Sequence, residues 1–342
     1  MKKVSPHMNK SLTARQRGFG LVELMVAMVL GLILIGGVLN IFLGNQQAFR
    51  SNEGLARLQE NARVSFELMA RDIREAGSNL CGVKLVGNVV NNANTTWSLN
   101  WSGGTVVGTS GTQTLTGVVT GTASGQRVTA TDAIQLLSAS LGPAIAISGS
   151  TPTSAQINVV TSTLSLTTNT IAFACDGTSG AIFQVTSVAG TAVFHVTGAG
   201  TPGNCSTGLG VPTNCATPTA PAKTFQPGGY LSPLTAAAWY VGNNSRGGRS
   251  LFRSTPATGA EEIAEGVVDM QLTYLLRDVA TGNLESDWVD AAAITNWTTA
   301  ASKQVVAVRV VLALQSLGRE GTNQQALERE LVHVVSIRER NL

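Results

Sequence analysis

The chain has 342 residues, of which 13% are charged, and its formal net charge is +3. Five basic residues and no acidic ones lie in the first 18 positions, so the rest of the chain carries 18 basic against 20 acidic residues. This balance argues against nucleic-acid binding by the body of the protein. The length is enough for one sizeable hydrophobic core.

An apolar segment, residues 19–43, follows the basic leader and contains one charged residue, Glu23. A helix of these 25 residues is about 37 Å long, which exceeds the ~30 Å hydrocarbon core of a bilayer. The small-residue cleavage site of a secretory signal does not follow it. Basic residues flank it on one side only, so the leader should stay in the cytoplasm and the rest should lie outside.

Glu23 is the unusual residue of this segment. An acid within a membrane span costs roughly 2.5–3.5 kcal/mol on insertion scales, so it indicates a function by default. The alternative from the residues alone is an acid near a helix N-terminus that interacts with the helix dipole and reaches toward water.

The neighbouring residues favour the functional interpretation. The stretch GFGLVE, residues 18–23, between a basic leader and an apolar helix, resembles the class III signal of type IV prepilins and pseudopilins. The resemblance implies cleavage after Gly18 by a prepilin peptidase and methylation of the new N-terminus at Phe19. It also implies that Glu23 pairs with the N-terminal amine of a neighbouring subunit. A buried carboxylate is tolerated when an opposite charge reaches it.

The following residues, 45–77, predict an amphipathic helix that continues the first one. No proline occurs between Pro6 and Pro143 and Gly77 is a suitable stop, so one helix from residue 19 to residue 76 is expected. Its apolar stripe should pack against a head domain. The stripe consists of Leu55, Leu58, Ala62, Phe66, Met69, Ile73 and Ala76. The charged face consists of Glu53, Arg57, Glu60, Arg63, Glu67, Arg71, Asp72, Arg74 and Glu75.

The remainder, residues 78–342, predicts a β-rich head. Short β-prone runs between glycines indicate strands and turns, while disorder would need more charge and less hydrophobicity. One long helix followed by strands is an α+β pattern, and the last three expected strands should form a central antiparallel sheet. The expected strands are 133–140, 155–160, 170–175, 181–188, 192–198, 237–242, 250–255, 267–278, 305–314 and 330–340.

Four cysteines lie beyond the apolar segment, an even number that fits disulfides in an oxidising compartment. Three pairings exist. The first choice is Cys205 with Cys215, which are close in sequence, and this leaves Cys81 with Cys175. The alternative is four free or metal-bound thiols, but the cysteines and histidines lack zinc-ligand spacing.

Several head segments, in chain order, look like a PilW-type minor pilin. They are RDIREAG (71–77), Cys81, residues 175–188, residues 263–276, residues 305–314 and a basic C-terminal strand ending in RERNL. The Gly/Thr-rich region 88–130 is not covered by this resemblance and is interpreted as an insertion.

Other patterns carry little weight. Residues 198–203 spell GxGxxG, but a Gly/Pro-rich loop follows in place of a helix, and no Walker A sequence occurs. No catalytic constellation, metal site or cofactor site is expected. The tryptophans are interpreted as core residues, with Trp97 and Trp101 alternatively exposed on an adhesive surface.

The sequence therefore predicts a membrane-inserted subunit with a cytoplasmic leader (1–18), a long helix (19–77, transmembrane over 19–43) and a head (78–342) in the periplasm. The resemblance implies a minor pilin that joins other minor pilins and the major pilin, primes pilus assembly and sits at the tip. One alternative is a minor pseudopilin of a type II secretion system. Another is a tip adhesin or binding module. A DNA-binding groove formed by Arg246, Arg249 and Arg253 is a weak variant of this alternative, because the charge balance opposes DNA as a ligand, and no nucleic-acid partner is expected.

Overall fold

The fold is described from a computed structural model, which describes residues 20–139, 143–161, 166–318, 321 and 325–338. The chain divides into two compact units, Met1–Glu53 and Gly54–Leu342. Helix α1 (Leu21–Arg74) begins in the first unit and ends in the second. The second half of the expected long helix is therefore part of the head.

The end of α1 is fixed by the residues that follow it. Gly77 adopts a left-handed φ of 78°, which favours glycine, and its N–H donates to the carbonyl of Leu137 at 2.8 Å. Ser78 Oγ donates to the carbonyl of Glu75 at 2.7 Å and so satisfies an acceptor of the last turn. Gly77 thus ends the helix as predicted.

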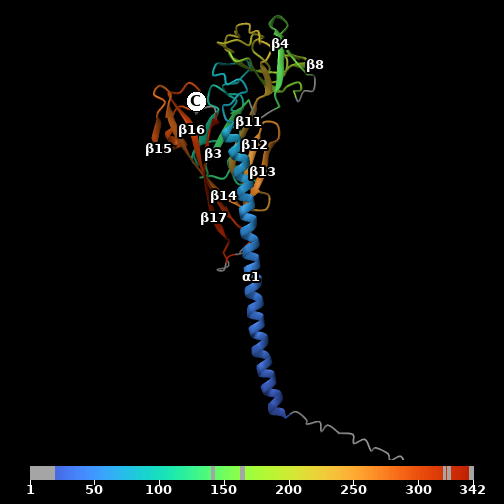
Figure 1. The fold of residues 1–342 in the computed structure, drawn as a ribbon, viewed down its shortest axis with the longest axis vertical. Coiled ribbons are helices and arrows are strands. Elements are labelled where there is room, and N and C mark those ends of the chain that lie inside the picture. The colour runs from blue at the N-terminus through green and yellow to red at the C-terminus, as the bar shows by residue number, and fades with distance from the viewer. Residues whose placement is uncertain (1–19, 140–142, 162–165, 319–320, 322–324, 339–342) are drawn as a thin grey trace, which may run out of the picture. The chain divides into compact units, whose positions relative to one another are not determined.

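The described residues of the second unit form three β-sheets and two short 3₁₀ helices (Figure 1). The eight-stranded sheet has the order β1-β7-β6-β10-β4-β5-β9-β8 and is antiparallel except for the pair β1 and β7. Its strands are β1 (Val86–Asn88), β4 (Ile145–Thr151), β5 (Gln156–Val159), β6 (Ile171–Cys175), β7 (Gly180–Gln184), β8 (Ser187–Ala189), β9 (Ala192–Phe194) and β10 (Tyr230–Pro233). The 3₁₀ helices are η1 (Pro152–Ser154) and η2 (Ala291–Ala293).

The two other sheets are antiparallel throughout. The five-stranded one has the order β13-β12-β11-β3-β2, and the four-stranded one has the order β15-β14-β16-β17. The strands of the first are β2 (Val106–Thr109), β3 (Ala133–Ser138), β11 (Thr235–Asn243), β12 (Arg249–Thr255) and β13 (Gly259–Glu265). Those of the second are β14 (Val267–Asp278), β15 (Leu284–Asp290), β16 (Lys303–Gln315) and β17 (Glu328–Ser336).

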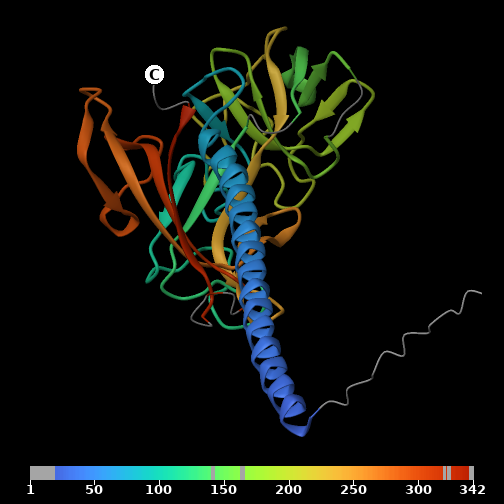
Figure 2. The ribbon, with the colours of Figure 1, turned by 60° about the horizontal axis from the view of Figure 1, so that its bottom comes forward.

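The main core lies where the C-terminal part of α1 meets the five- and four-stranded sheets. Figure 2 shows the ribbon of this part of the helix within the second unit. Met69 and Ile73 are fully buried there, together with Trp239 of β11, Tyr274 of β14 and Val308 of β16. A second core is formed mainly by residues of the eight-stranded sheet. A third core joins this sheet to β3 through residues such as Leu137 and Phe173. This arrangement confirms the α+β fold with one long helix and a β-rich head.

The predicted strands fare differently along the chain. The last three, now β14, β16 and β17, pair as neighbours in one antiparallel sheet, as expected. The prediction of a single strand at 181–188 is wrong. The structure splits it into β7, which pairs with β6, and β8, which pairs with β9, so the chain changes partner between residues 184 and 187.

The Gly/Thr-rich region 88–130 is integrated into the head. It supplies β2, which pairs with β3 inside the five-stranded sheet. Buried Arg127 binds its loops, donating to the carbonyls of Gln113 at 2.8 Å and Ser110 at 3.0 Å, and also to that of Thr131. Burial lowers the pKa of Arg127, although nearby Asp132 opposes that shift.

Candidate functional site

The N-terminal signal is only partly within the described residues. Gly18 and Phe19, the predicted cleavage and methylation residues, lie outside them. Glu23 lies in the first turn of α1 with its side chain exposed. A carboxylate at a helix N-terminus is compatible with the helix dipole, so the helix tolerates Glu23 at this position.

The first part of α1 has no polar face. Every residue from 21 to 30 is exposed, including Leu21 at 77%, and the apolar side chains continue exposed to Leu43. By length and composition this helix can cross a membrane. A helix that is apolar all round needs lipid or other helices around it.

The last part of α1, from Gly54 on, belongs to the head unit. The predicted stripe faces the main core: Leu58, Met69 and Ile73 are buried, and Phe66 stacks on His333 of β17 with ring centroids 3.7 Å apart. Burial of each large apolar side chain contributes about 1.5–3 kcal/mol. The stripe thus attaches the helix to the head, as expected.

Asp72 corrects the predicted charged face. The sequence analysis placed it on the solvent side, but it is buried at 5% exposure. Its Oδ2 atom accepts hydrogen bonds from Trp239 Nε1 at 2.9 Å and Arg253 Nε at 2.8 Å. The guanidinium of Arg253 also lies 5.9 Å from the centroid of the Trp239 ring. A buried carboxylate costs free energy unless it is paired and hydrogen-bonded, and here both conditions hold.

The spacing along α1 contained a signal for this contact. Residues 58, 65 and 72 recur every seven positions, and all three are buried. Asp72 is also three residues after Met69 and adjacent to Ile73, both in the stripe. An acid beside stripe positions needs a partner when it is buried, and here the partners come from strands β11 and β12, far along the chain.

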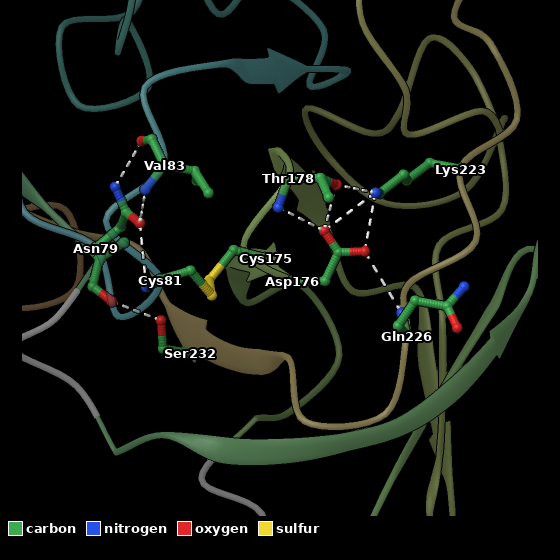
Figure 3. The surroundings of a disulfide bond; sticks show 10 residues. Asn79, Cys81, Val83, Cys175, Asp176, Thr178, Lys223, Gln226 and Ser232 are labelled. Atoms are coloured by element: carbon green, nitrogen blue, oxygen red, sulfur yellow. Dashed lines mark hydrogen bonds and ion pairs between the residues drawn. A yellow bond between two sulfur atoms is a disulfide. The ribbon is translucent and has the colours of Figure 1, made fainter.

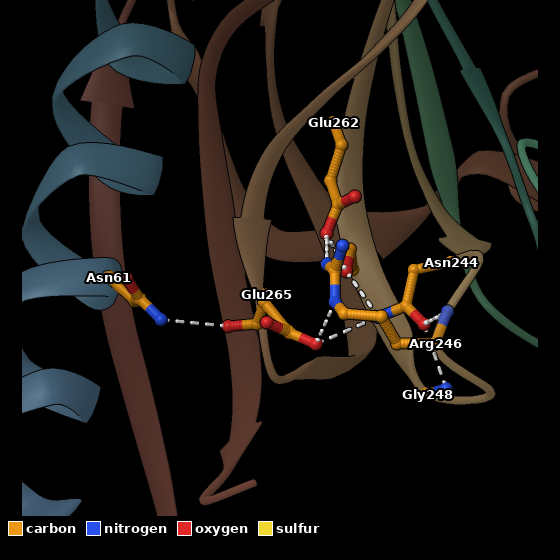
Figure 4. A network of polar contacts seen from close by, with 7 residues as sticks. Asn61, Asn244, Arg246, Gly248, Glu262 and Glu265 are labelled. Atoms are coloured by element: carbon orange, nitrogen blue, oxygen red, sulfur yellow. Dashed lines mark hydrogen bonds and ion pairs between the residues drawn. The ribbon is translucent and has the colours of Figure 1, made fainter.

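A second polar network joins α1 to the β12–β13 hairpin (Figure 4). Asn61 Nδ2 donates to the backbone carbonyl of Glu265 at 3.0 Å, and Arg246 Nε donates to the Glu265 carboxylate at 2.6 Å. Arg246 also pairs with Glu262. The carboxylates of β13 therefore hold the loop before β12 in place.

These contacts bear on the DNA-binding groove considered from the sequence. Arg246 binds Glu262 and Glu265, and Arg253 binds Asp72. Arg249 Nη1 donates to the carbonyl of Val268 at 2.9 Å. Each of the three arginines is thus paired with an acceptor of the head itself, although Arg246 and Arg249 are exposed, and they do not form a free basic groove.

One disulfide connects the segment after α1 to the end of β6. Cys81 is bonded to Cys175, 94 residues further on, as Figure 3 shows. Asn79 shapes the Cys81 turn, because its Oδ1 accepts from the N–H groups of Cys81 at 3.2 Å and Val83 at 3.0 Å. The disulfide therefore fixes the segment that follows the helix to the end of β6.

Asp176, next to this disulfide, is held by a lysine. Lys223 Nζ lies 2.8 Å from Asp176 Oδ2, and the aspartate side chain is 2% exposed. Burial alone would raise the pKa of Asp176, but hydrogen bonds from Lys223 and Thr178 outweigh it and lower that pKa to about 2. The pair fixes the loop of Lys223 against the end of β6.

The second disulfide joins Cys205 and Cys215, ten residues apart. It closes a loop, and the N–H of Cys205 ties this loop to the residue after β1 by donating to the carbonyl of Val89 at 2.7 Å. The two disulfides are the pairs that the sequence analysis chose first. Among the described residues, no cysteine is free and no cluster of His, Cys, Asp or Glu has the arrangement of a metal site.

The GxGxxG stretch is a loop. Gly198, Gly200 and Gly203 have φ values of 74°, 82° and 76°, and the described residues after them contain no helix up to β10. The side chain of Gln184 occupies the turn, with its Oε1 accepting from Gly203 N–H at 2.6 Å. The position that a phosphate would need is therefore filled by an amide.

Comparison with known sequence families identifies the chain. Residues 238–335 match the family described as Type IV Pilus-assembly protein W, and residues 13–39 match the prokaryotic N-terminal methylation motif. The chain is a PilW-like type IV pilin with a prepilin-type signal. No curated protein and no solved structure matches it.

The PilW match runs from β11 into β17. It contains Trp239, Arg253 and His333, which contact α1, whereas Asp72 and Phe66 lie outside the matched segment. The matched segment of this PilW-like pilin thus contains residues that contact the C-terminal part of α1.

The two matched families are components of pili rather than enzymes. They imply that this PilW-like pilin interacts with other pilus components and with the prepilin peptidase. The apolar helix and the signal are consistent with anchoring in the inner membrane and incorporation into a pilus.

Proposed function

We propose that this protein is a minor pilin that joins other minor pilins in the inner membrane and primes assembly of a type IV pilus. A filament extended from its base keeps its first subunits at the far end, so this role gives the protein a place at the pilus tip. The head lies in the periplasm before assembly, because the basic leader favours the cytoplasmic side of the membrane.

The proposal begins with processing of the leader. A prepilin peptidase cleaves after Gly18 and methylates the new N-terminus at Phe19, so Glu23 becomes the fifth residue of the mature chain. The carboxylate of Glu23 then pairs with the N-terminal amine of a neighbouring pilin. In a low-dielectric environment an unpaired carboxylate is costly, so this ion pair selects one register between adjacent helices.

The observation that carries the proposal is that the two parts of α1 differ in their surroundings. Its first part is exposed, apolar and marked by Glu23, and its last part is buried in the head and held by Asp72. A subunit that assembles through its helix needs this combination, because forces on the helix must be transmitted to the head.

Deletion of the chain tests the priming role. Surface pili are sheared and quantified in the deletion strain, once with retraction intact and once in a retraction-defective background. A priming subunit predicts that pili disappear in the first strain and partly return in the second, because rare unprimed filaments then persist. Unchanged pilus number in both strains would contradict priming and would favour a secretion pseudopilus or an adhesive head.

A further inference from the structure

The head contains a polar cleft of about 500 Å³, within the size range of small-molecule sites. One wall is formed by β1 and the residues that follow it, and the other by residues 213–216. Five asparagines line it, and none of the described residues that line it is charged. They are Asn88, Asn91, Asn92, Asn94 and Asn214, with Trp101 beside them.

The walls of the cleft are held in place by contacts far apart in sequence. Asn88 N–H donates to Thr213 Oγ1 at 3.2 Å, which ties the two walls together. Asn88 Nδ2 donates to the carbonyl of Leu99 at 2.8 Å, and Asn91 Nδ2 donates to that of Pro202 at 2.9 Å. The Cys205–Cys215 disulfide closes the loop that carries the second wall. A ligand therefore meets a preformed surface and loses less entropy on binding.

The rim of the cleft contains side-chain amide groups that are available for hydrogen bonds to a ligand. Among the described residues, the side chains of Asn92 and Asn94 have no hydrogen-bond partner, and both residues are exposed. Asn214 uses its Oδ1 to accept from Ala216 N–H at 2.9 Å, which leaves its Nδ2 as a donor. Asn92 has a left-handed φ of 58°, a conformation that asparagine adopts more readily than most other residues.

We propose that this cleft binds a neutral saccharide. A side-chain amide offers donors and an acceptor at once, and a sugar hydroxyl needs both. The uncharged lining gives no reason to select a phosphate or a carboxylate. A peptide would need apolar pockets for its side chains, whereas this lining is mostly polar. Trp101 is 6% exposed and packs on Phe173 at 5.5 Å, so it supports the cleft from beneath.

The inference does not depend on the priming role. A primer at the pilus tip exposes its head to the surroundings, but the cleft would bind a sugar wherever the head is accessible. Loss of sugar binding and loss of pili are therefore separate observations, and each can fail without the other.

A glycan array tests the cleft directly. The full chain is purified in a zwitterionic detergent that has no sugar headgroup and is applied to immobilised neutral and acidic oligosaccharides. The test variant combines Asn92→Gly, which accepts the left-handed backbone, with Asn94→Ala. The control is Asn283→Ala, which removes an exposed asparagine that does not line the cleft. Thermal unfolding checks that all variants are folded.

The expected result is saturable binding of at least one neutral oligosaccharide by the wild type. Loss of two amide contacts should weaken that binding about tenfold or more, while the control stays within about twofold. The proposal is overturned if the wild type binds no neutral oligosaccharide, or if the cleft variant binds as tightly as the control. Binding of acidic glycans alone, falling with added salt, also overturns it, as does binding confined to a parallel array of neutral peptides.

Discussion

The indole N–H of Trp239 donates to the Asp72 carboxylate at 2.9 Å, across 167 residues of chain. The contact joins the last turn of α1 to a strand in the middle of the five-stranded sheet. Arg253 neutralises the same oxygen from the neighbouring strand. The last turn of the helix is thus connected to the head through a paired, buried charge.

Substitution of Asp72 by alanine should lower the free energy of unfolding of the head by about 3 kcal/mol or more, because Trp239 and Arg253 lose their shared acceptor. The measurement is chemical denaturation of the purified chain, followed by tryptophan fluorescence. Glu67→Ala on the same helix is the matched control. Its ion pair with Arg63 is exposed on both sides, so its loss should be nearly neutral. Equal effects of the two variants would mean that the Asp72 contact adds nothing to stability.

The two disulfides should differ in their contribution to stability. In the chain-entropy description, the 94-residue separation of Cys81 and Cys175 corresponds to about 4–5 kcal/mol, and the ten-residue separation of Cys205 and Cys215 to about 2.5–3 kcal/mol. Cys81→Ser/Cys175→Ser should therefore destabilise the head more than Cys205→Ser/Cys215→Ser. Denaturation of both double variants checks the order, and peptide mapping under non-reducing conditions checks the pairing. A mixed pairing such as Cys81 with Cys205 would contradict the structure.

The stability of the head should depend on pH through His195. This side chain is 2% exposed and packs against Phe183, and burial lowers its pKa from 6.5 to about 4. The unfolded chain then binds a proton that the folded chain does not. The stabilisation is complete above pH 6.5 and is lost progressively as the pH falls to about 4, by about 3 kcal/mol. Denaturation at several pH values measures this slope.

His195→Phe provides the comparison, because phenylalanine fills a similar space without titrating. The variant should lose most of the pH dependence between 6.5 and 4, while its stability at pH 7 changes less. A wild-type slope that persists in the variant would show that other groups cause it. Asp176 does not contribute in this window, because its pKa of about 2 makes its contribution fall only below pH 3.8.

The parts of the fold that follow from local sequence were predictable. Gly77 ends α1 because its left-handed conformation favours glycine, and β14 and β16 are long runs rich in Val, Leu and other β-prone residues that indicate strands. Strands β10 and β13 were missed for opposite reasons. β10 ends in Pro233 within a loop-like region, and β13 carries three glutamates that an edge strand tolerates.

The site depended on contacts that the sequence does not encode locally. The apolar stripe from Leu55 to Ala76 indicated which face of α1 is buried, but nothing in the sequence near Asp72 indicated that Trp239 is its partner. The walls of the cleft likewise come from segments far apart in sequence, which meet where Asn88 N–H donates to Thr213 Oγ1. The signal around Glu23, in contrast, is a contiguous motif, and a contiguous motif needs no tertiary structure to be recognised.

The most direct test of this account is the pilus level of a deletion strain that expresses Glu23→Ala. Gly18→Ala, which should keep the leader, and Glu60→Ala, which removes an exposed acid of the head unit, serve as the two controls. Mass spectrometry of the membrane-bound chain reports whether the leader has been removed.

We predict that Glu23→Ala is cleaved after Gly18 and methylated at Phe19, yet sheared pili fall to the level of the deletion strain. The alanine variant lacks the carboxylate that pairs with the amine of the neighbouring subunit, so subunits insert in the membrane without selecting a register. Glu60→Ala should restore wild-type pili. Normal pilus number with Glu23→Ala would contradict the claim that this carboxylate joins the protein to its neighbours.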